Sequence, residues 1–89
     1  MTTTTITTYP RLTVLTIGDG RAVNLPARVP GVSMTTADAL RNALEYTSAS
    51  DVHAYLVECW QDAERVGATD AQVIHHFVTW CASAGDWAE

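Results

Sequence analysis

The chain contains no lysine, and its basic residues are five arginines set against ten acidic residues, for a formal net charge of −5. Binding to nucleic-acid phosphates depends on clustered Lys and Arg. The composition therefore disfavours a nucleic-acid partner, and the acidic residues are too scattered to imitate DNA. Charged residues make up only 17% of the chain, which leaves uncharged surface available for a protein partner.

Long apolar runs are also missing, and none approaches the ~20 residues that a membrane-spanning helix needs. The start of the chain, residues 1–8, is polar and lacks the basic and apolar regions of a secretion signal. We therefore expect a cytoplasmic protein without membrane insertion, whose two cysteines stay reduced.

The 89 residues predict one domain. We interpret the threonine-rich residues 1–8 as a disordered tail; the alternative is an added strand at a sheet edge. Residues 9–89 are interpreted as a single small α+β domain.

Residues 11–25 predict a β-hairpin, because β-branched and apolar residues flank Gly18-Asp19-Gly20, a strong tight-turn signal. Pro26 and Pro30 then end regular strand pairing.

Three helices are predicted after the hairpin, over about 36–47, 51–66 and 70–84. For the first, Thr35 or Thr36 is the expected cap, and Arg41 and Glu45 form an expected surface pair.

Ser50 is the expected cap of the second helix, and Gly67 its left-handed end. Thr69 and Gln72 form a capping box at the third helix, which we expect to end at Gly85. The predicted fold is α+β, with three helices packed on an N-terminal hairpin. The inner faces of the second and third helices are predicted to be Val52, Tyr55, Leu56, Cys59, Ala63 and Val66, and Val73, Phe77, Trp80, Cys81 and Ala84.

The spacing of Ala63, Gly67 and Val73 fits a helix-turn-helix, so a DNA-binding regulator using residues 59–79 is an alternative function. Its recognition face would be Gln72, His75, His76 and Thr79, none of which is Lys or Arg. A local patch of Arg11, Arg21 and Arg28 could partly compensate. We favour a plain helical hairpin, because reading DNA needs phosphate contacts to hold register.

A metal- or thiol-based small protein is a further alternative, since His53, His75, His76, Cys59 and Cys81 lie within one stretch. No two of them have the local spacing of zinc ligands on one helix face. Both cysteines fall in apolar stripes, where a free thiol behaves as a small hydrophobe. We therefore predict no metal ligand, no cofactor and no catalytic residue, and a protein that is not an enzyme.

The tryptophans and exposed aromatic residues remain as candidates for binding a partner. Trp80 is predicted to be in the core and Trp60 at its margin, whereas Trp87 follows the last helix and either folds back or stays exposed. The predicted partner-binding residues are Trp87, Trp60, His75, His76 and Tyr46.

The first strand of the hairpin is uncharged after Arg11 and apolar on both faces, so its edge could pair with a second copy to form a homodimer. No known family is recognised. In size and composition the chain resembles the small accessory proteins of actinobacterial phages, many of which bind a host protein, but the resemblance covers no motif. The predicted function is a small non-enzymatic protein-interaction module, with a host protein as partner if the chain is encoded by a phage.

Overall fold

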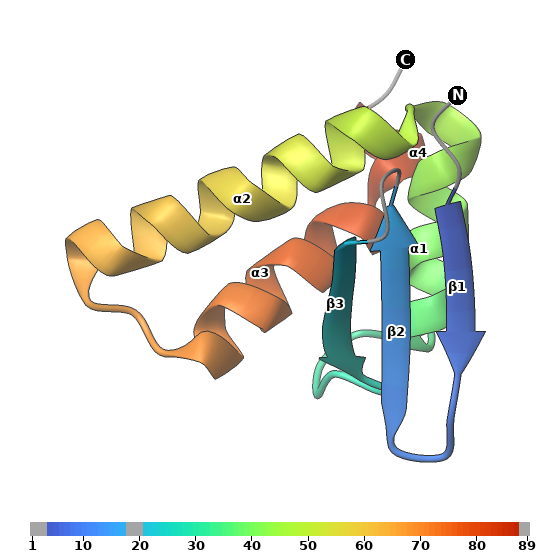
Figure 1. Ribbon diagram of the computed structural model, residues 1–89, viewed down its shortest axis with the longest axis horizontal. Helices are drawn as coiled ribbons and strands as arrows, with labels where there is room; N and C mark the ends of the chain where they lie inside the picture. The colour runs from blue at the N-terminus through green and yellow to red at the C-terminus, as the bar shows by residue number, and fades with distance from the viewer. Residues whose placement is uncertain (1–3, 18–20, 88–89) are drawn as a thin grey trace.

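The computed structural model describes residues 4–17 and 21–87. A three-stranded antiparallel sheet comes first, followed by the helices (Figure 1). The elements are β1 (Thr4–Thr8), β2 (Leu12–Ile17), β3 (Arg21–Pro26), α1 (Thr36–Tyr46), α2 (Ala49–Val66), α3 (Asp70–Ala82) and α4 (Ala84–Trp87). The predicted α+β class, with an N-terminal hairpin followed by packed helices, is confirmed. The predicted turn at residues 18–20 lies outside the described residues.

The prediction of a disordered tail is wrong for Thr4–Thr8, which form β1 and pair with β2 from Thr4↔Ile17 to Thr8↔Thr13. Threonine favours extended backbone, and the half-buried Ile6 packs against the core opposite Leu15. Because β1 occupies one side of β2 and β3 the other, the strand edge expected to pair with a second chain is already filled.

The helices that follow the sheet pack on one of its faces. Every second side chain of β2 points toward that face; these are Thr13, Leu15 and Ile17, which are at most 6% exposed. α1 packs against α3, where the Asn42 amide donates hydrogen bonds to the carbonyls of Cys81 and Ala82 at 3.0 and 3.3 Å. The buried core comprises Leu15, Ile17, Leu25, Val29, Ala39, Leu40, Ala43, Val52, Leu56, Phe77, Val78, Cys81 and Ala84.

α1 begins as predicted, with the Thr35 hydroxyl accepting a hydrogen bond from the Asp38 amide at 3.2 Å. Arg41 lies 3.7 Å from the Asp38 carboxylate instead of pairing with Glu45. Helical side chains tilt toward the helix N-terminus, so Arg41 reaches the residue one turn before it.

α2 begins earlier than predicted. The Ser48 hydroxyl, not that of Ser50, caps the helix by accepting from the Asp51 amide at 3.1 Å. The Thr47 hydroxyl adds a 2.8 Å hydrogen bond to the Asp51 carboxylate, which fixes the start two residues before the predicted cap. The predicted end is confirmed, since Gly67 has a left-handed φ of 72°.

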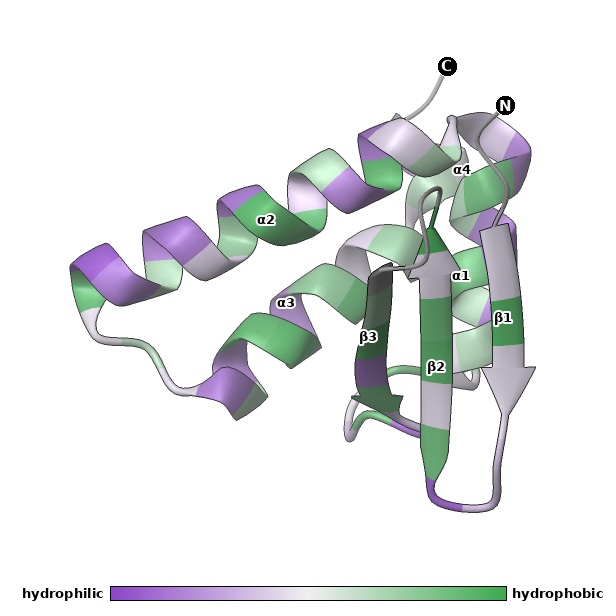
Figure 2. Cartoon of the chain, in the orientation of Figure 1, coloured by the Kyte–Doolittle hydropathy of each residue, from purple (hydrophilic) through white to green (hydrophobic). Residues whose placement is uncertain are grey.

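α2 and α3 extend past β3, so the helical layer is wider than the sheet (Figure 1). α2 shows alternating hydrophilic and hydrophobic bands, as expected of an amphipathic helix at the surface (Figure 2). Val66 was predicted on the inner face but is 78% exposed, because it lies in the last turn of this extension. No helix in the described part of the chain is long and apolar enough to cross a membrane.

The capping box of α3 is confirmed, with the Thr69 hydroxyl accepting from the Gln72 amide and the Gln72 side chain accepting from the Thr69 amide. The predicted end at Gly85 is wrong. α3 stops at Ala82, because the backbone of Ser83 leaves the helical conformation, with φ −94° and ψ 9°. α4 then follows, with Gly85 inside it.

Candidate functional site

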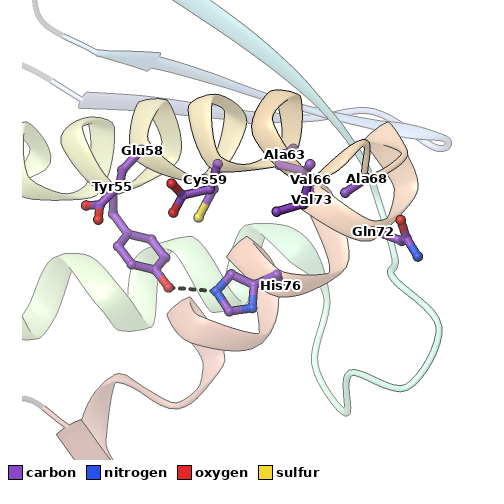
Figure 3. A pocket seen from close by; sticks show the side chains of 10 residues that line it. Tyr55, Glu58, Cys59, Ala63, Val66, Ala68, Gln72, Val73 and His76 are labelled. Atoms are coloured by element: carbon purple, nitrogen blue, oxygen red, sulfur yellow. Dashed lines mark hydrogen bonds between the residues drawn. The ribbon is translucent and has the colours of Figure 1, made fainter.

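A cleft of about 240 Å³ lies between α2 and α3, on the part of the chain where the sequence concentrates Cys, His and Trp. A 2.8 Å hydrogen bond joins the Tyr55 hydroxyl to Nε2 of His76 and closes one end of the cleft. In Figure 3 these two side chains point toward each other from facing helices, while Ala68 and Gln72 lie at the opposite end. The remaining lining residues are Glu58, Cys59, Asp62, Ala63, Val66 and Val73.

A row of stacked rings runs from this cleft to the C-terminal helix, and we call His76, Tyr55, Trp80 and Trp87 the aromatic row. The Tyr55 and Trp80 rings are 4.1 Å apart at 14°, and the Trp80 and Trp87 rings are 4.4 Å apart at 16°. His76 continues the row from Tyr55 at 6.1 Å. Near-parallel aromatic pairs at such distances attract one another beyond the effect of burial. The row therefore ties α2, α3 and α4 together.

Trp87 folds back onto the body of the protein yet keeps an exposed surface. Its indole Nε1 donates a 2.8 Å hydrogen bond to the Trp80 carbonyl, and 39% of the residue is exposed. Tyr46, at the end of α1, is 49% exposed and lies against α4, where a side chain on Gly85 would come within 3.3 Å of its hydroxyl. Two exposed aromatic residues thus come together at α4, Trp87 within the helix and Tyr46 against it.

Burial controls the ionisation of the reactive groups near the row. It raises the pKa of Tyr55 to about 12, and Cys59 and Glu58 add to the shift. It also raises the pKa of the Cys59 thiol, against a smaller lowering by Tyr55, and raises the pKa of Cys81 to about 12. Both thiols are therefore protonated at neutral pH, and neither has the thiolate character of a nucleophile or metal ligand.

The cysteines are both free and buried, and they belong to different apolar clusters. Across residues 4–17 and 21–87, no three His, Cys, Asp or Glu side chains come together in a way that could hold a metal ion.

The five predicted partner-binding residues do not form one surface. His76 and Trp87 belong to the aromatic row, and Tyr46 joins them through α4. Trp60 instead lines a second cavity, between α2 and β3. His75 lies beside the loop before α1, with Nε2 3.4 Å from the position that a side chain on Gly31 would take.

The side chains predicted to read DNA are partly engaged inside the protein. Gln72 is held by the capping box and His76 by Tyr55, while Thr79 is exposed. Arg11 and Arg28 line one cavity, away from α3. The side chain of Arg21 is outside the described part of the structure.

Sequence reasoning missed the roles of Tyr55 and Trp80, which it assigned to the inner helix faces. The separation of Trp80 and Trp87 by seven residues, two helical turns, is a signal that they share a face. Nothing in the sequence places Tyr55 against Trp80, because that contact depends on how α2 packs on α3.

Comparisons with protein-family profiles, with curated proteins and with solved structures give no match to this chain.

Proposed function

We propose that this protein is a small non-enzymatic interaction module that binds a protein partner through an aromatic surface made of the aromatic row and Tyr46. The observation that carries the proposal is the state of Trp87, which is fixed by a stack and a hydrogen bond and still 39% exposed. Tryptophan and tyrosine are enriched among the residues that supply most of the energy in protein interfaces.

Prior ordering of these rings favours binding. A side chain that is already immobilised loses little rotamer entropy when a partner covers it, so more of the interaction energy appears as affinity. Trp87 is held on one side by Trp80 and in place by the Trp80 carbonyl, which leaves its exposed surface free for a partner. The same surface has the exposed Tyr46 at its border.

Charge indicates the kind of partner surface. The chain carries a net charge of −5, and the exposed Glu45 and Asp86 adjoin Tyr46 and Trp87 in the sequence. A matching partner has an apolar pocket for Trp87, bordered by basic residues that steer association. The protonated state of both thiols supports a binding role over nucleophilic catalysis.

The proposal extends to a cytoplasmic setting and, for a phage-encoded chain, to a host protein as partner. Three features support this extension: the use of arginine without lysine, the abundance of threonine, and the small size of the chain. The acidic balance disfavours nucleic acid as the partner, because phosphate binding needs clustered positive charge.

Affinity capture from actinobacterial lysate, followed by quantitative mass spectrometry, tests the proposal. We expect one protein to be enriched by the wild type and by Tyr9→Ala, a matched change at an aromatic residue that is 52% exposed and outside the aromatic surface. Trp87→Ala should lose that protein, and calorimetry with the purified partner should show affinity weakened about tenfold or more. Circular dichroism checks that each variant is folded, and equal capture by all three proteins would contradict the proposal.

A further inference from the structure

The outer edge of β3 presents unpaired backbone groups. The amide and carbonyl of Leu12 are hydrogen bonded to Tyr9, at 3.4 and 2.7 Å, so both point away from β3. The pair Leu12↔Pro26 is therefore a non-hydrogen-bonded position of the β2–β3 ladder, and such positions recur at every second residue. The next two such positions along β3 are Asn24 and Ala22, so their backbone N–H and C=O groups point away from β2, outward from the sheet.

One end of this edge is closed and the other is open. The Pro26 carbonyl accepts a 2.6 Å hydrogen bond from the buried hydroxyl of Thr36, and the Thr36 amide donates to Ala27 at 3.0 Å. Among the residues that the structure describes, no hydrogen bond from a loop, cap or side chain reaches Ala22 or Asn24, and both are exposed. This segment can therefore accept another strand.

A cavity of about 430 Å³ adjoins the open part of the edge. The cavity touches the three consecutive residues 22–24 of β3. Successive side chains of a strand point to opposite faces of the sheet, so a cavity on one face would not touch all three. It therefore meets β3 along the edge of the sheet. Its apolar wall comes from α2, where Trp60 is half-buried and Val57 is 40% exposed. The full lining is Ala22, Val23, Asn24, His53, Leu56, Val57, Trp60, Gln61 and Glu64.

The helical layer behind this edge is wider than the sheet, since α2 and α3 continue past β3 (Figures 1 and 2). A single strand added to β3 would lie over this extension and cover apolar side chains of α2. A second copy of the chain fits poorly, because the helices that back its own sheet would occupy the same space as the extension. Edge and cavity together therefore favour a lone extended segment.

We propose that an extended peptide segment of a partner protein adds to β3 as a fourth strand. Its backbone pairs with the outward groups of Ala22 and Asn24, and an apolar side chain enters the cavity against Trp60. Glu64 is the acidic residue of the lining, so a basic residue next to the apolar one completes the match. This groove is separate from the aromatic surface, so either proposal can fail without the other.

Random peptides of about eight residues, somewhat longer than a typical strand, serve as the probe in a display selection against the full chain. The best binder, labelled with fluorescein, is then titrated by anisotropy. Asn24→Pro removes one outward N–H without touching the β2 ladder and should weaken binding about tenfold or more, whereas the matched Asn24→Thr keeps that N–H and should stay within about twofold. Trp60→Ala should also weaken binding, while Val66→Ala, outside the groove, should not.

A scan of single backbone N-methyl groups along the peptide uses only the wild-type protein and so does not depend on whether a variant folds. Affinity should fall at every second position, because the N–H groups of an added strand point alternately toward β3 and away from it. Failure to select any binder, equal binding by Asn24→Pro and Asn24→Thr, or a scan without alternation would overturn the proposal. A concentration-dependent dimer in analytical ultracentrifugation that Asn24→Pro abolishes would overturn it too, since the occupant would then be a second copy.

Discussion

Replacing Trp87 by alanine removes the last ring of the aromatic row and the hydrogen bond to the Trp80 carbonyl. With 39% of the residue exposed, about three fifths is buried, or roughly 120 Å² of a large aromatic side chain. At about 25 cal/mol per Å², this burial stabilises by about 3 kcal/mol. Release of the short α4 segment in the variant recovers conformational entropy and offsets part of that loss. We therefore expect the free energy of unfolding to fall by about 1–2 kcal/mol.

Urea unfolding at pH 7, followed by far-ultraviolet circular dichroism, measures this change. Trp87→Phe keeps a ring on Trp80 and loses only the indole donor, so it should cost about 1 kcal/mol or less. Tyr9→Ala, at an exposed aromatic residue outside the row, should change stability by less than about 0.5 kcal/mol. If Trp87→Ala matched the wild type, or if the indole N–H of Trp87 exchanged with solvent as fast as a free indole, the assigned role of the stack would be wrong.

Three other changes should shift stability in directions that the structure sets. Thr69→Ala removes the capping hydroxyl of α3 and should cost about 1 kcal/mol in urea unfolding, whereas Thr79→Ala, at an exposed position of the same helix, should cost much less. Thr13→Val should raise the free energy of unfolding by about 1 kcal/mol, because the buried Thr13 hydroxyl has no hydrogen-bond partner among the described residues. The contribution of Cys81 to stability should be constant below pH 9 and should be lost as the pH rises from 9 toward 12, because folding raises the pKa of its thiol from 9.0 to about 12, and Cys81→Ala should make that alkaline fall shallower.

Each of these changes has an outcome that would contradict its reasoning. Equal losses from the two threonine-to-alanine variants of α3 would argue against the cap. A destabilised Thr13→Val would mean that the hydroxyl has a partner. An unchanged alkaline slope in Cys81→Ala would assign the pH dependence to other groups, of which Tyr55 and Cys59 also have raised pKa values.

Much of the helical architecture was predictable because its signals are local. A capping box and a left-handed glycine act within one helical turn, so Thr69, Gln72 and Gly67 could be placed without knowing the rest of the fold. The cap of α2 was misplaced because Ser48 and Ser50 are equivalent by residue type. In the structure the contacts of Asp51 with Ser48 and Thr47 distinguish the two positions.

The candidate site was predictable in composition but not in arrangement. The sequence predicted Trp87, Tyr46 and His76 among the partner-binding residues, and the structure groups these three while separating Trp60 and His75 from them. Such grouping depends on the packing of α2 and α4 on α3, which joins residues far apart in the chain.

The class of fold, the order of hairpin and helices, and most helix ends could be predicted from the sequence alone, because each follows from interactions between near neighbours in the chain. Three features became clear only in the folded chain: the pairing of β1 with β2, the stacking of Tyr55 on Trp80, and the open edge of β3 beside α2. These features depend on contacts between distant segments, whose partners no local pattern specifies. The open edge of the sheet illustrates the difference. It was predicted on β2, but β1 pairs with that side of β2, and the open edge beside α2 belongs to β3.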